Sequence, residues 1–410
     1  MKKVFAEKLL CAIDIGTTKI CALIAQQVAN GELQILGIGK VPSDGLRKGV
    51  VVDIARAIVS IKKAIEEAEL MAGTTMHSVV IGISGGHIQS RNAYGAAPIA
   101  RGEVTQEDIA RTIAAARAIQ LPEGQQVLHV LPQYFSIDGQ DRIQDPLGMH
   151  GIRLEVQVHI ITGAISSVQN LIKCCQMAGV KVQDVVLEQL ASALAVLNDD
   201  ERELGVAMLD IGGGTSDLAL YQGGTIRHTM VVPIAGNLFT SDLAVGLRTT
   251  IKDAERIKRE YGLVNFDLIG QDKEIEVEMV QGGKTRMIMQ TEVFDILEPR
   301  AQELLSIVHE EILGRNLTHL LVSGFVLTGG GALLEGMKEV TEDILDVPVR
   351  IGKPQSTQTG LEMLQSPIFA TAYGLLLYAA KQQGVGNFSE EDNGVSRLLM
   401  RMKSWVSDFF

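Results

Sequence analysis

The sequence has few cysteines, and none is spaced for a disulfide framework or a zinc site. The four are Cys11, Cys21, Cys174 and Cys175, with one adjacent pair and no Cys-x-x-Cys motif. Its eight histidines are scattered, without the spacing that zinc ligands need. This pattern predicts free thiols in a reducing compartment and no zinc site.

Long apolar runs and an excess of positive charge are also missing. We find no stretch of roughly 18 apolar residues that could span a bilayer, and no signal peptide at the start of the sequence. The formal net charge is −12, which disfavours a nucleic-acid-binding surface and general attraction to anionic lipid. We therefore expect a cytoplasmic protein that binds no nucleic acid and touches a membrane only through a local basic segment.

One strand–turn–strand unit occurs twice in the 410 residues, a length that suits two or three domains. Its Asp-Ile-Gly turn begins at Asp14 and again at Asp210, 196 positions later (210 − 14). A repeat at that distance predicts a duplicated domain, because solenoid repeats have shorter periods. Between the copies, residues 84–162 carry a helix start signal at Thr105 and alternating strand patterns, which indicate an insert.

Each Asp-Ile-Gly turn combines a carboxylate at a strand end with glycines and hydroxyls, which suits phosphate binding. Glycine lets backbone N–H groups approach phosphate oxygens, threonine hydroxyls can donate further hydrogen bonds, and Lys19 adds positive charge. Because Asp14 and Asp210 would repel phosphate, we expect them to hold Mg²⁺ through its water shell. Two such turns in corresponding places favour this reading over ordinary hairpin turns. The predicted phosphate-site residues are Asp14, Gly16, Thr17, Thr18, Lys19, Asp210, Gly212, Gly213, Gly214 and Thr215.

A third glycine-rich junction supports a nucleotide ligand. The apolar residues from Val326 run into Gly329, Gly330 and Gly331, and a helix is predicted from about Leu333 onward to residue 344. Such a junction suits close contact with a flat group such as adenine. By itself it is equally compatible with a helix entry that binds no ligand.

With these three segments in place, the chain resembles the superfamily of actin, sugar kinases and heat-shock chaperone ATPases, and within it the FtsA family of bacterial cell-division proteins. Residues 203–217, 227–237 and 253–258 carry this resemblance, which extends over nearly the whole chain. It implies a two-lobed, actin-like α/β fold built on a duplicated ribonuclease-H-like unit, with an inserted strand–helix–strand–strand subdomain. The implied cofactors are ATP and Mg²⁺, with at most a weak Mg²⁺-dependent ATPase activity.

The resemblance also implies domain boundaries and further adenosine contacts. Adenosine would lie against Gly329–Gly331, beside Gly236, and against the helix that contains Glu255 and Lys258. The expected domains are a first lobe at 1–83 and 163–197, an inserted subdomain at 84–162, and a second lobe at 198–381 that includes a subdomain at 240–305.

Partners follow from the same resemblance. The family binds the C-terminal tail of the tubulin-like protein FtsZ through the subdomain at 240–305, where Arg300 and Glu303 are the candidate contacts. A solvated helix face explains these two charges equally well. The inserted subdomain is implicated in self-association into filaments and in contacts with other division proteins.

One residue is a candidate for catalysis. Relatives position a water molecule with Glu or Gln at the start of a helix of small residues, and Glu188 matches this place, with Gln189 next to it. The alternative is an acidic residue that stabilises the helix N-terminus through the helix dipole.

The last residues differ from the rest of the chain. Residues 382–394 contain three glycines and three acids and predict a flexible linker, whereas the apolar residues of 395–410 trace one face of a helix. Such a helix, about 24 Å long, is too short and too charged to span a bilayer but suits the interface of acidic lipids. The alternative is a terminal helix packed on the body. The predicted membrane-binding residues are Arg397, Leu398, Leu399, Arg401, Met402, Lys403, Trp405, Val406, Phe409 and Phe410.

Together these features predict an ATP-binding, actin-like cell-division protein that polymerises, anchors FtsZ filaments to the membrane and helps recruit later division proteins. We expect a peripheral protein on the cytoplasmic face of the inner membrane at the division septum. A small-molecule kinase of the same superfold is one alternative, which would need a catalytic aspartate facing a substrate cleft and no tail. A pilus-assembly actin homologue is another, with the same turns and insert but a different partner.

Overall fold

Two five-stranded sheets form the centre of the molecule. The structure is a computed structural model that describes the chain apart from residues 1–8, 29–31, 281–282, 356–361 and 385–410. Within this described part, the first sheet has the order β11-β6-β1-β2-β3 and the second the order β14-β13-β12-β17-β18. The strands of the first sheet are β1 (Leu9–Ile15), β2 (Lys19–Gln27), β3 (Leu33–Pro42), β6 (Ser78–Ile83) and β11 (Lys181–Leu187). Those of the second are β12 (Val206–Ile211), β13 (Ser216–Gln222), β14 (Thr225–Val232), β17 (Phe325–Thr328) and β18 (Val349–Ile351).

The two sheets are copies of one design. In each, three antiparallel strands that follow one another in sequence are extended by two parallel strands on the side of the first: β1-β2-β3 by β6 and β11, and β12-β13-β14 by β17 and β18. The predicted duplication is therefore confirmed strand by strand. Since equivalent strands end at equivalent turns, both Asp-Ile-Gly turns lie at the same place in their own sheet.

The insert is a separate layer with its own apolar core. It consists of β7 (Gln89–Pro98), α2 (Gln106–Arg117), β8 (Gln125–Ile137), β9 (Gln140–Ile143) and β10 (Arg153–Ala164), with the sheet order β7-β10-β8-β9. The short strand β9 is an addition to the predicted strand–helix–strand–strand pattern. The helix begins where the sequence indicated, because Thr105 and Asp108 form a reciprocal capping box.

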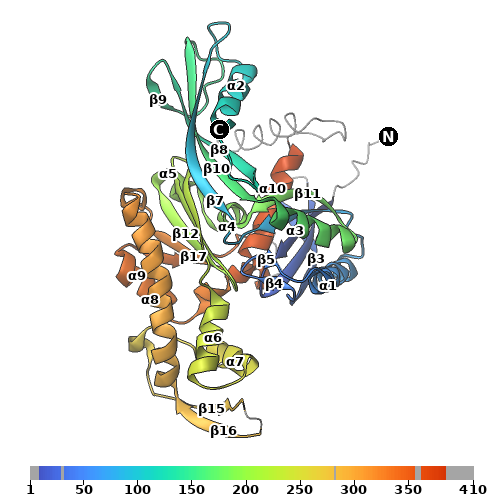
Figure 1. Cartoon of the computed structure of the whole chain (residues 1–410), viewed down its shortest axis with the longest axis vertical. Helices are drawn as coiled ribbons and strands as arrows, with labels where there is room; N and C mark the ends of the chain where they lie inside the picture. Colours follow the sequence, from blue (N-terminus) through green and yellow to red (C-terminus); the bar gives the residue numbers. More distant parts are fainter. Residues whose placement is uncertain (1–8, 29–31, 281–282, 356–361, 385–410) are drawn as a thin grey trace.

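The insert also contacts the second lobe, although the chain enters and leaves it from the first. The Ser90 hydroxyl donates to the carbonyl of Thr229 at 2.9 Å, and the Gln133 amide donates to the carbonyl of Ile226 at 2.8 Å. His159 lies 3.0 Å from the Thr229 hydroxyl. These contacts form a polar seam between the insert and β14. Figure 1 shows the insert at one end of the elongated molecule and the hairpin of β15 (Glu274–Glu278) and β16 (Thr285–Met289) at the other.

Glycines allow helices to lie close to the first sheet. Helix α1 (Ile54–Ala72) packs over β3, where a Cβ on Gly37 or Gly39 would come within 2.1 or 1.9 Å of carbonyl oxygens of Ala68 or Ala64. The remaining helices of the first lobe are α3 (Ile165–Met177) and α4 (Glu188–Val196), and α5 (Asp199–Leu204) leads into the second lobe. The second lobe carries α6 (Gly236–Gly246), α7 (Ile251–Tyr261), α8 (Gln290–Gly314) and α9 (Met337–Leu345).

Two helical boundaries differ from the predictions. The helix expected from about Leu333 begins only at Met337, because residues 330–333 form a 3₁₀ turn and Gly336 takes a left-handed φ of 85° just before it. Helix α10 (Ala370–Gly384) continues three residues into the predicted linker at 382–394. The rest of that linker and the predicted membrane helix at 395–410 lie outside the described residues.

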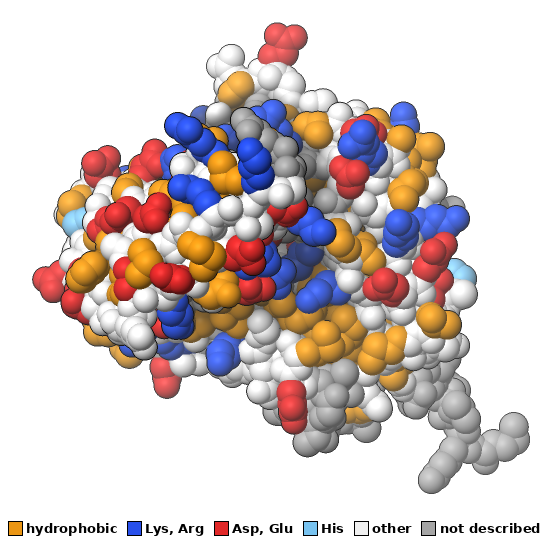
Figure 2. All heavy atoms as spheres, turned by 90° about the horizontal axis from the view of Figure 1, so that it is seen from below, with side chains coloured by type: hydrophobic (Ala, Val, Ile, Leu, Met, Phe, Trp, Pro, Cys, Tyr) orange, Lys and Arg blue, Asp and Glu red, His pale blue; other side chains and the backbone are white. Residues whose placement is uncertain are grey.

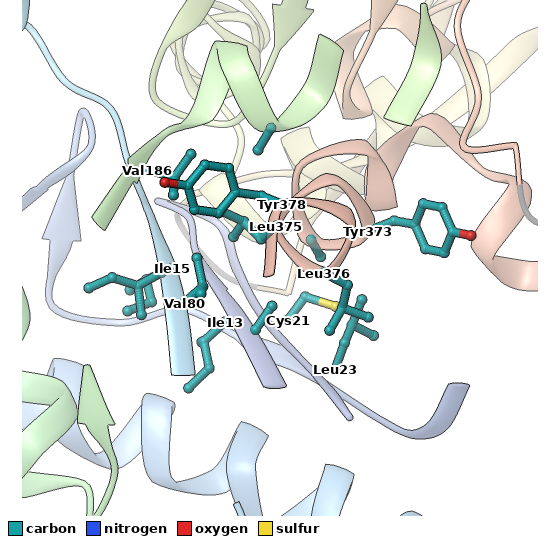
Figure 3. Close-up of a cluster of buried hydrophobic side chains, with 14 of the residues drawn as sticks. Ile13, Ile15, Cys21, Leu23, Val80, Val186, Tyr373, Leu375, Leu376 and Tyr378 are labelled. Atoms are coloured by element: carbon teal, nitrogen blue, oxygen red, sulfur yellow. The ribbon is translucent and has the colours of Figure 1, made fainter. Parts of the chain in front are cut away.

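Helices α4 and α10 pack against each other more closely than side chains normally allow. A Cβ on Gly374 of α10 would lie 1.8 Å from the carbonyl oxygen of Ala191 in α4. Other α10 side chains, among them Leu375 and Leu376, pack into the apolar cluster that also holds Ile13 and Leu23 of the first sheet, as Figure 3 shows. Glycine at 374 therefore sets the distance between two helices that lie beside the strand ends.

The described residues include no helix long and apolar enough to cross a membrane. All four cysteines are buried and none is in a disulfide, which confirms the prediction of free thiols.

We expect Gly374→Ala to lower the free energy of unfolding by about 1–3 kcal/mol, since a methyl group forced into a packed contact has that cost. The cost exceeds the ~0.5–1 kcal/mol that alanine gains over glycine within a helix. Urea denaturation measures it. Gly314→Ala is the matched control, because a Cβ there meets nothing within 4 Å. Equal stability of the two variants would contradict the close packing of α4 and α10.

Candidate functional site

The two Asp-Ile-Gly turns have the same backbone geometry. The N–H of Gly16 donates to the carbonyl of Lys19 at 3.0 Å, and the N–H of Gly212 donates to the carbonyl of Thr215 at 2.9 Å. Each aspartate is the next-to-last residue of its strand, so its carboxylate stands at the base of the turn. The two turns, which are similar in sequence, thus also form the same backbone hydrogen bond.

The turns touch each other across the two lobes. A Cβ on Gly213 would lie 1.7 Å from the hydroxyl oxygen of Thr18, and a Cβ on Gly214 would lie 2.4 Å from that of Thr17. The Thr18 hydroxyl donates to the side-chain oxygen of Asn237 at 3.2 Å. Only residues without side chains fit at 213 and 214, so these glycines permit the lobes to meet.

Carboxylates gather where the turns meet. Asp14, Asp210 and Asp217 are 3%, 7% and 3% exposed. The Lys19 ammonium lies 2.5 Å from Asp14. Burial alone would lower the pKa of Lys19, but the charge of Asp14 and its hydrogen bond to Lys19, with smaller contributions from Cys21 and Asp210, together outweigh burial, and the pKa is raised. Lys19 therefore remains a cation at neutral pH.

The remaining acids of the cluster hold protons more tightly than usual. Burial raises the pKa of Asp217 to about 7, against the opposing hydrogen bond from Ser84, and the charge of Asp210 raises it further. Burial, followed by the charges of Asp14, Asp217 and Asp210, raises the pKa of Glu188 well above its usual value. Burial also raises the pKa of Asp210. These shifts show that burial and the neighbouring acids together disfavour the charged form of Asp217, Asp210 and Glu188.

A hydrated divalent cation suits these clustered carboxylates, because its charge would favour their ionised form. Carboxylate oxygens are the groups that Mg²⁺ prefers, and Mg²⁺ usually keeps several of its waters. In the described part of the chain, no three or more His, Cys, Asp or Glu side chains are placed to hold a metal directly. Contact of Asp14 and Asp210 with Mg²⁺ through its water shell stays a prediction.

The residues predicted to contact adenosine lie next to the second turn. The N–H of Gly236 donates to the carbonyl of Gly212 at 3.0 Å. The Lys258 ammonium donates to the carbonyl of Gly236 at 3.0 Å and pairs with Glu255 at 2.6 Å. These contacts join α6 and α7 to the turn.

The glycine-rich junction lies against the same turn. Gly329 has a left-handed φ of 80°, and a Cβ on it would lie 2.2 Å from Oδ1 of Asp210. A Cβ on Gly331 would lie 2.2 Å from the Ile211 side chain, whereas one on Gly330 would meet only Ile368, at 3.6 Å. The backbone of the junction therefore lies so close to Asp210 that no side chain fits at Gly329.

Arg300 and Glu303 lie on α8, apart from this cluster. Arg300 forms a two-point ion pair with Asp242 of α6, at 2.6 and 3.1 Å, and also pairs with Glu303. The arginine is therefore held by its own lobe. The candidate tail residues from Arg397 to Phe410 lie outside the described residues.

Sequence reasoning missed Asp217 and its partners. The Ser84 hydroxyl donates to Oδ1 of Asp217 at 2.6 Å, and the Gln189 amide donates to the same oxygen at 3.0 Å, so residues of the first lobe hold an acid of the second. Asp217 could have been found, because it stands opposite Asp210 in the β12–β13 hairpin. Ser84 carries no local signal, and Gln189 was noted only as the neighbour of Glu188; its contact with Asp217 depends on the packing of the lobes.

Comparisons with known proteins agree with this arrangement. Residues 207–374 match the family described as "Cell division protein FtsA", and residues 85–162 match the "SHS2 domain inserted in FTSA". The chain is 42% identical to the cell division protein FtsA of Pseudomonas aeruginosa, with 100% of both chains covered. It is 38% identical to the FtsA protein of Escherichia coli, again over 100% of each.

Solved structures share the fold at lower identity. The "PilM-PilN type IV pilus biogenesis complex" matches with 20% identity and a TM-score of 0.65, covering 90% of this chain and 98% of that one. MreB5 of Spiroplasma citri bound to ADP matches with 17% identity and a TM-score of 0.57, covering 92% and 99%. The predicted actin-like, two-lobed fold with an inserted subdomain is confirmed.

We expect Asp217→Asn to reduce the pH dependence of stability of the nucleotide-free protein. A carboxyl whose folded pKa is about 7 takes up a proton on folding, because an unfolded aspartate has a pKa of about 3.9. The unchanged protein therefore loses stability as pH rises between these values, and asparagine cannot ionise. In thermal unfolding between pH 5 and 8, the melting temperature of the variant should rise relative to that of the unchanged protein as the pH increases.

The exposed Asp343 provides the control, as Asp343→Asn, for which the difference in melting temperature should stay nearly constant over the same pH range. The same constant difference for Asp217→Asn would show that Asp217 does not hold its proton in the folded state.

Proposed function

Because the chain belongs to the FtsA family of cell division proteins, we propose that it binds ATP and Mg²⁺ between its lobes and anchors FtsZ filaments to the membrane. The observation that carries the nucleotide part is the meeting of two glycine turns over buried carboxylates. Backbone N–H groups of both turns and the Lys19 ammonium would bind the phosphates. Asp14 and Asp210 would hold hydrated Mg²⁺, which neutralises phosphate charge and lowers the pKa of nearby acids.

The distribution of surface charge supports an anionic ligand. Seen from the hairpin end, several Lys and Arg side chains lie in and around a recess near the middle of the face, with Asp and Glu side chains at its rim (Figure 2). The Lys and Arg side chains there would favour association with anions such as nucleotides. Fold relatives solved with ADP and with AMPPNP, both named MreB5, support the same ligand class.

For ATP hydrolysis we propose only a minor role. Glu188 stands at the N-terminus of α4 beside the carboxylate cluster, where it could orient a water molecule once a cation has lowered its pKa. We propose slow turnover, with bound ATP acting mainly to favour a closed arrangement of the lobes and so polymerisation.

The partner contacts complete the proposal. The helix at 395–410 would lie in the interface of acidic lipids, and a filament of such chains would bind more firmly than one chain because many weak anchors act together. The subdomain at 240–305 would bind the FtsZ tail, with Glu303 and Arg300 at its edge. The insert at 84–162 would serve self-association and later division proteins.

Co-sedimentation of the full-length protein with lipid vesicles tests the proposed membrane anchor. With ATP and Mg²⁺ present, we expect the protein to co-sediment with vesicles that contain anionic lipid. Removal of residues 395–410, or Trp405→Glu on the apolar face, should lower the bound fraction about tenfold or more, because membrane binding scales with buried apolar area. Ser404→Glu, at a polar position of the same helix, is the matched control and should lower it much less.

Recovery of the full-length protein in the supernatant would contradict the anchor. Rapid phosphorylation of a sugar would favour the kinase alternative instead.

A further inference from the structure

We propose that Ser192 and Thr371 are positioning residues for Asp210: their hydroxyls fix one carboxylate oxygen and so aim the other at the Mg²⁺–nucleotide complex. This inference rests on the proposed nucleotide site.

The geometry is a triangle of three buried oxygens. The Ser192 hydroxyl donates to Oδ2 of Asp210 at 2.5 Å, and the Thr371 hydroxyl donates to the same oxygen at 3.1 Å. The two hydroxyl oxygens lie 3.0 Å apart. All three residues are buried. Two donors on one oxygen restrict rotation of the carboxylate about its terminal bond, because turning it would break both hydrogen bonds.

The second oxygen of Asp210 is aimed by the same constraint. Oδ1 faces the glycine-rich junction, where a Cβ on Gly329 would come within 2.2 Å of it. With Oδ2 held from the helix side, Oδ1 is left facing this junction, against which the proposed nucleotide would lie. A carboxylate that binds a hydrated cation gains from such pre-orientation, because no rotational freedom remains to be lost on binding.

The two hydroxyls are unusual for their positions. Ser192 lies in the interior of α4, whose other residues after Glu188 are mostly small or apolar, and Thr371 is the second residue of α10. An apolar side chain would fill either place without the cost of burying a hydroxyl, which is favourable only where the hydroxyl is hydrogen-bonded. The close packing at Gly374 brings these helices together, so that both hydroxyls reach one carboxylate.

The test compares Thr371→Val, which keeps the shape and removes the hydroxyl, with Thr371→Ser, which keeps the hydroxyl. The dissociation constant of a fluorescent ATP analogue is measured with Mg²⁺ and with EDTA, on the full-length protein. Loss of one hydrogen bond to a charged group predicts that Thr371→Val weakens binding about 5- to 20-fold with Mg²⁺ but less than about twofold in EDTA. Ser192→Ala should behave likewise, and Thr371→Ser should stay within about twofold of the unchanged protein in both.

Equal weakening by Thr371→Val with Mg²⁺ and in EDTA would overturn the inference, since it would indicate a general packing role. The inference would also be overturned if Thr371→Val left both dissociation constants unchanged. It would be overturned as well if Thr371→Ser weakened Mg²⁺-dependent binding as much as Thr371→Val does. If the unchanged protein bound no ATP analogue in either condition, the proposed function itself would fail, and the inference with it.

Discussion

The removal of several neighbouring carboxylates from water where the lobes meet is the constraint on which the rest of the site depends. Asp14, Asp210, Asp217 and Glu188 all approach the place where the two turns meet, and Lys19 offsets only part of their charge. Asp14 pairs with Lys19, whereas the pKa values of Asp210, Asp217 and Glu188 are raised, first by burial. In the proposed function, a divalent ion bound there would favour the ionised form of these acids and so offset the cost of their burial.

The duplicated fold explains why this charge cluster exists at all. In each copy of the strand–turn–strand unit, the first strand ends in an aspartate followed by a glycine turn. The two sheets meet at these turns. Neither copy alone brings more than one turn to the site. Glycines at 213 and 214 then decide how closely the lobes approach, since a side chain on either would collide with the threonines of the opposite turn.

The sequence predicted what is local and missed what depends on packing. The turns, the capping box at Thr105 and the repeat all lie in short segments whose residue types have one dominant structural meaning. Ser192 and Thr371 could not be found in this way, because they lie 179 positions apart and meet only after the helices have packed. The late start of α9 was missed for a related reason, because three glycines in a row permit a 3₁₀ turn as readily as a helix.

The polar seam along β14 has a mechanical consequence. The insert is joined to the first lobe by its chain and to the second by hydrogen bonds from Ser90 and Gln133. A change in the angle between the lobes would therefore also move the insert or break these hydrogen bonds. Because the insert extends to one end of the molecule, its tip would sweep through a larger arc than the lobes themselves (Figure 1). With the lobe closure proposed above, the insert would act as a lever arm, turning a small change in the angle between the lobes into a larger displacement of its tip.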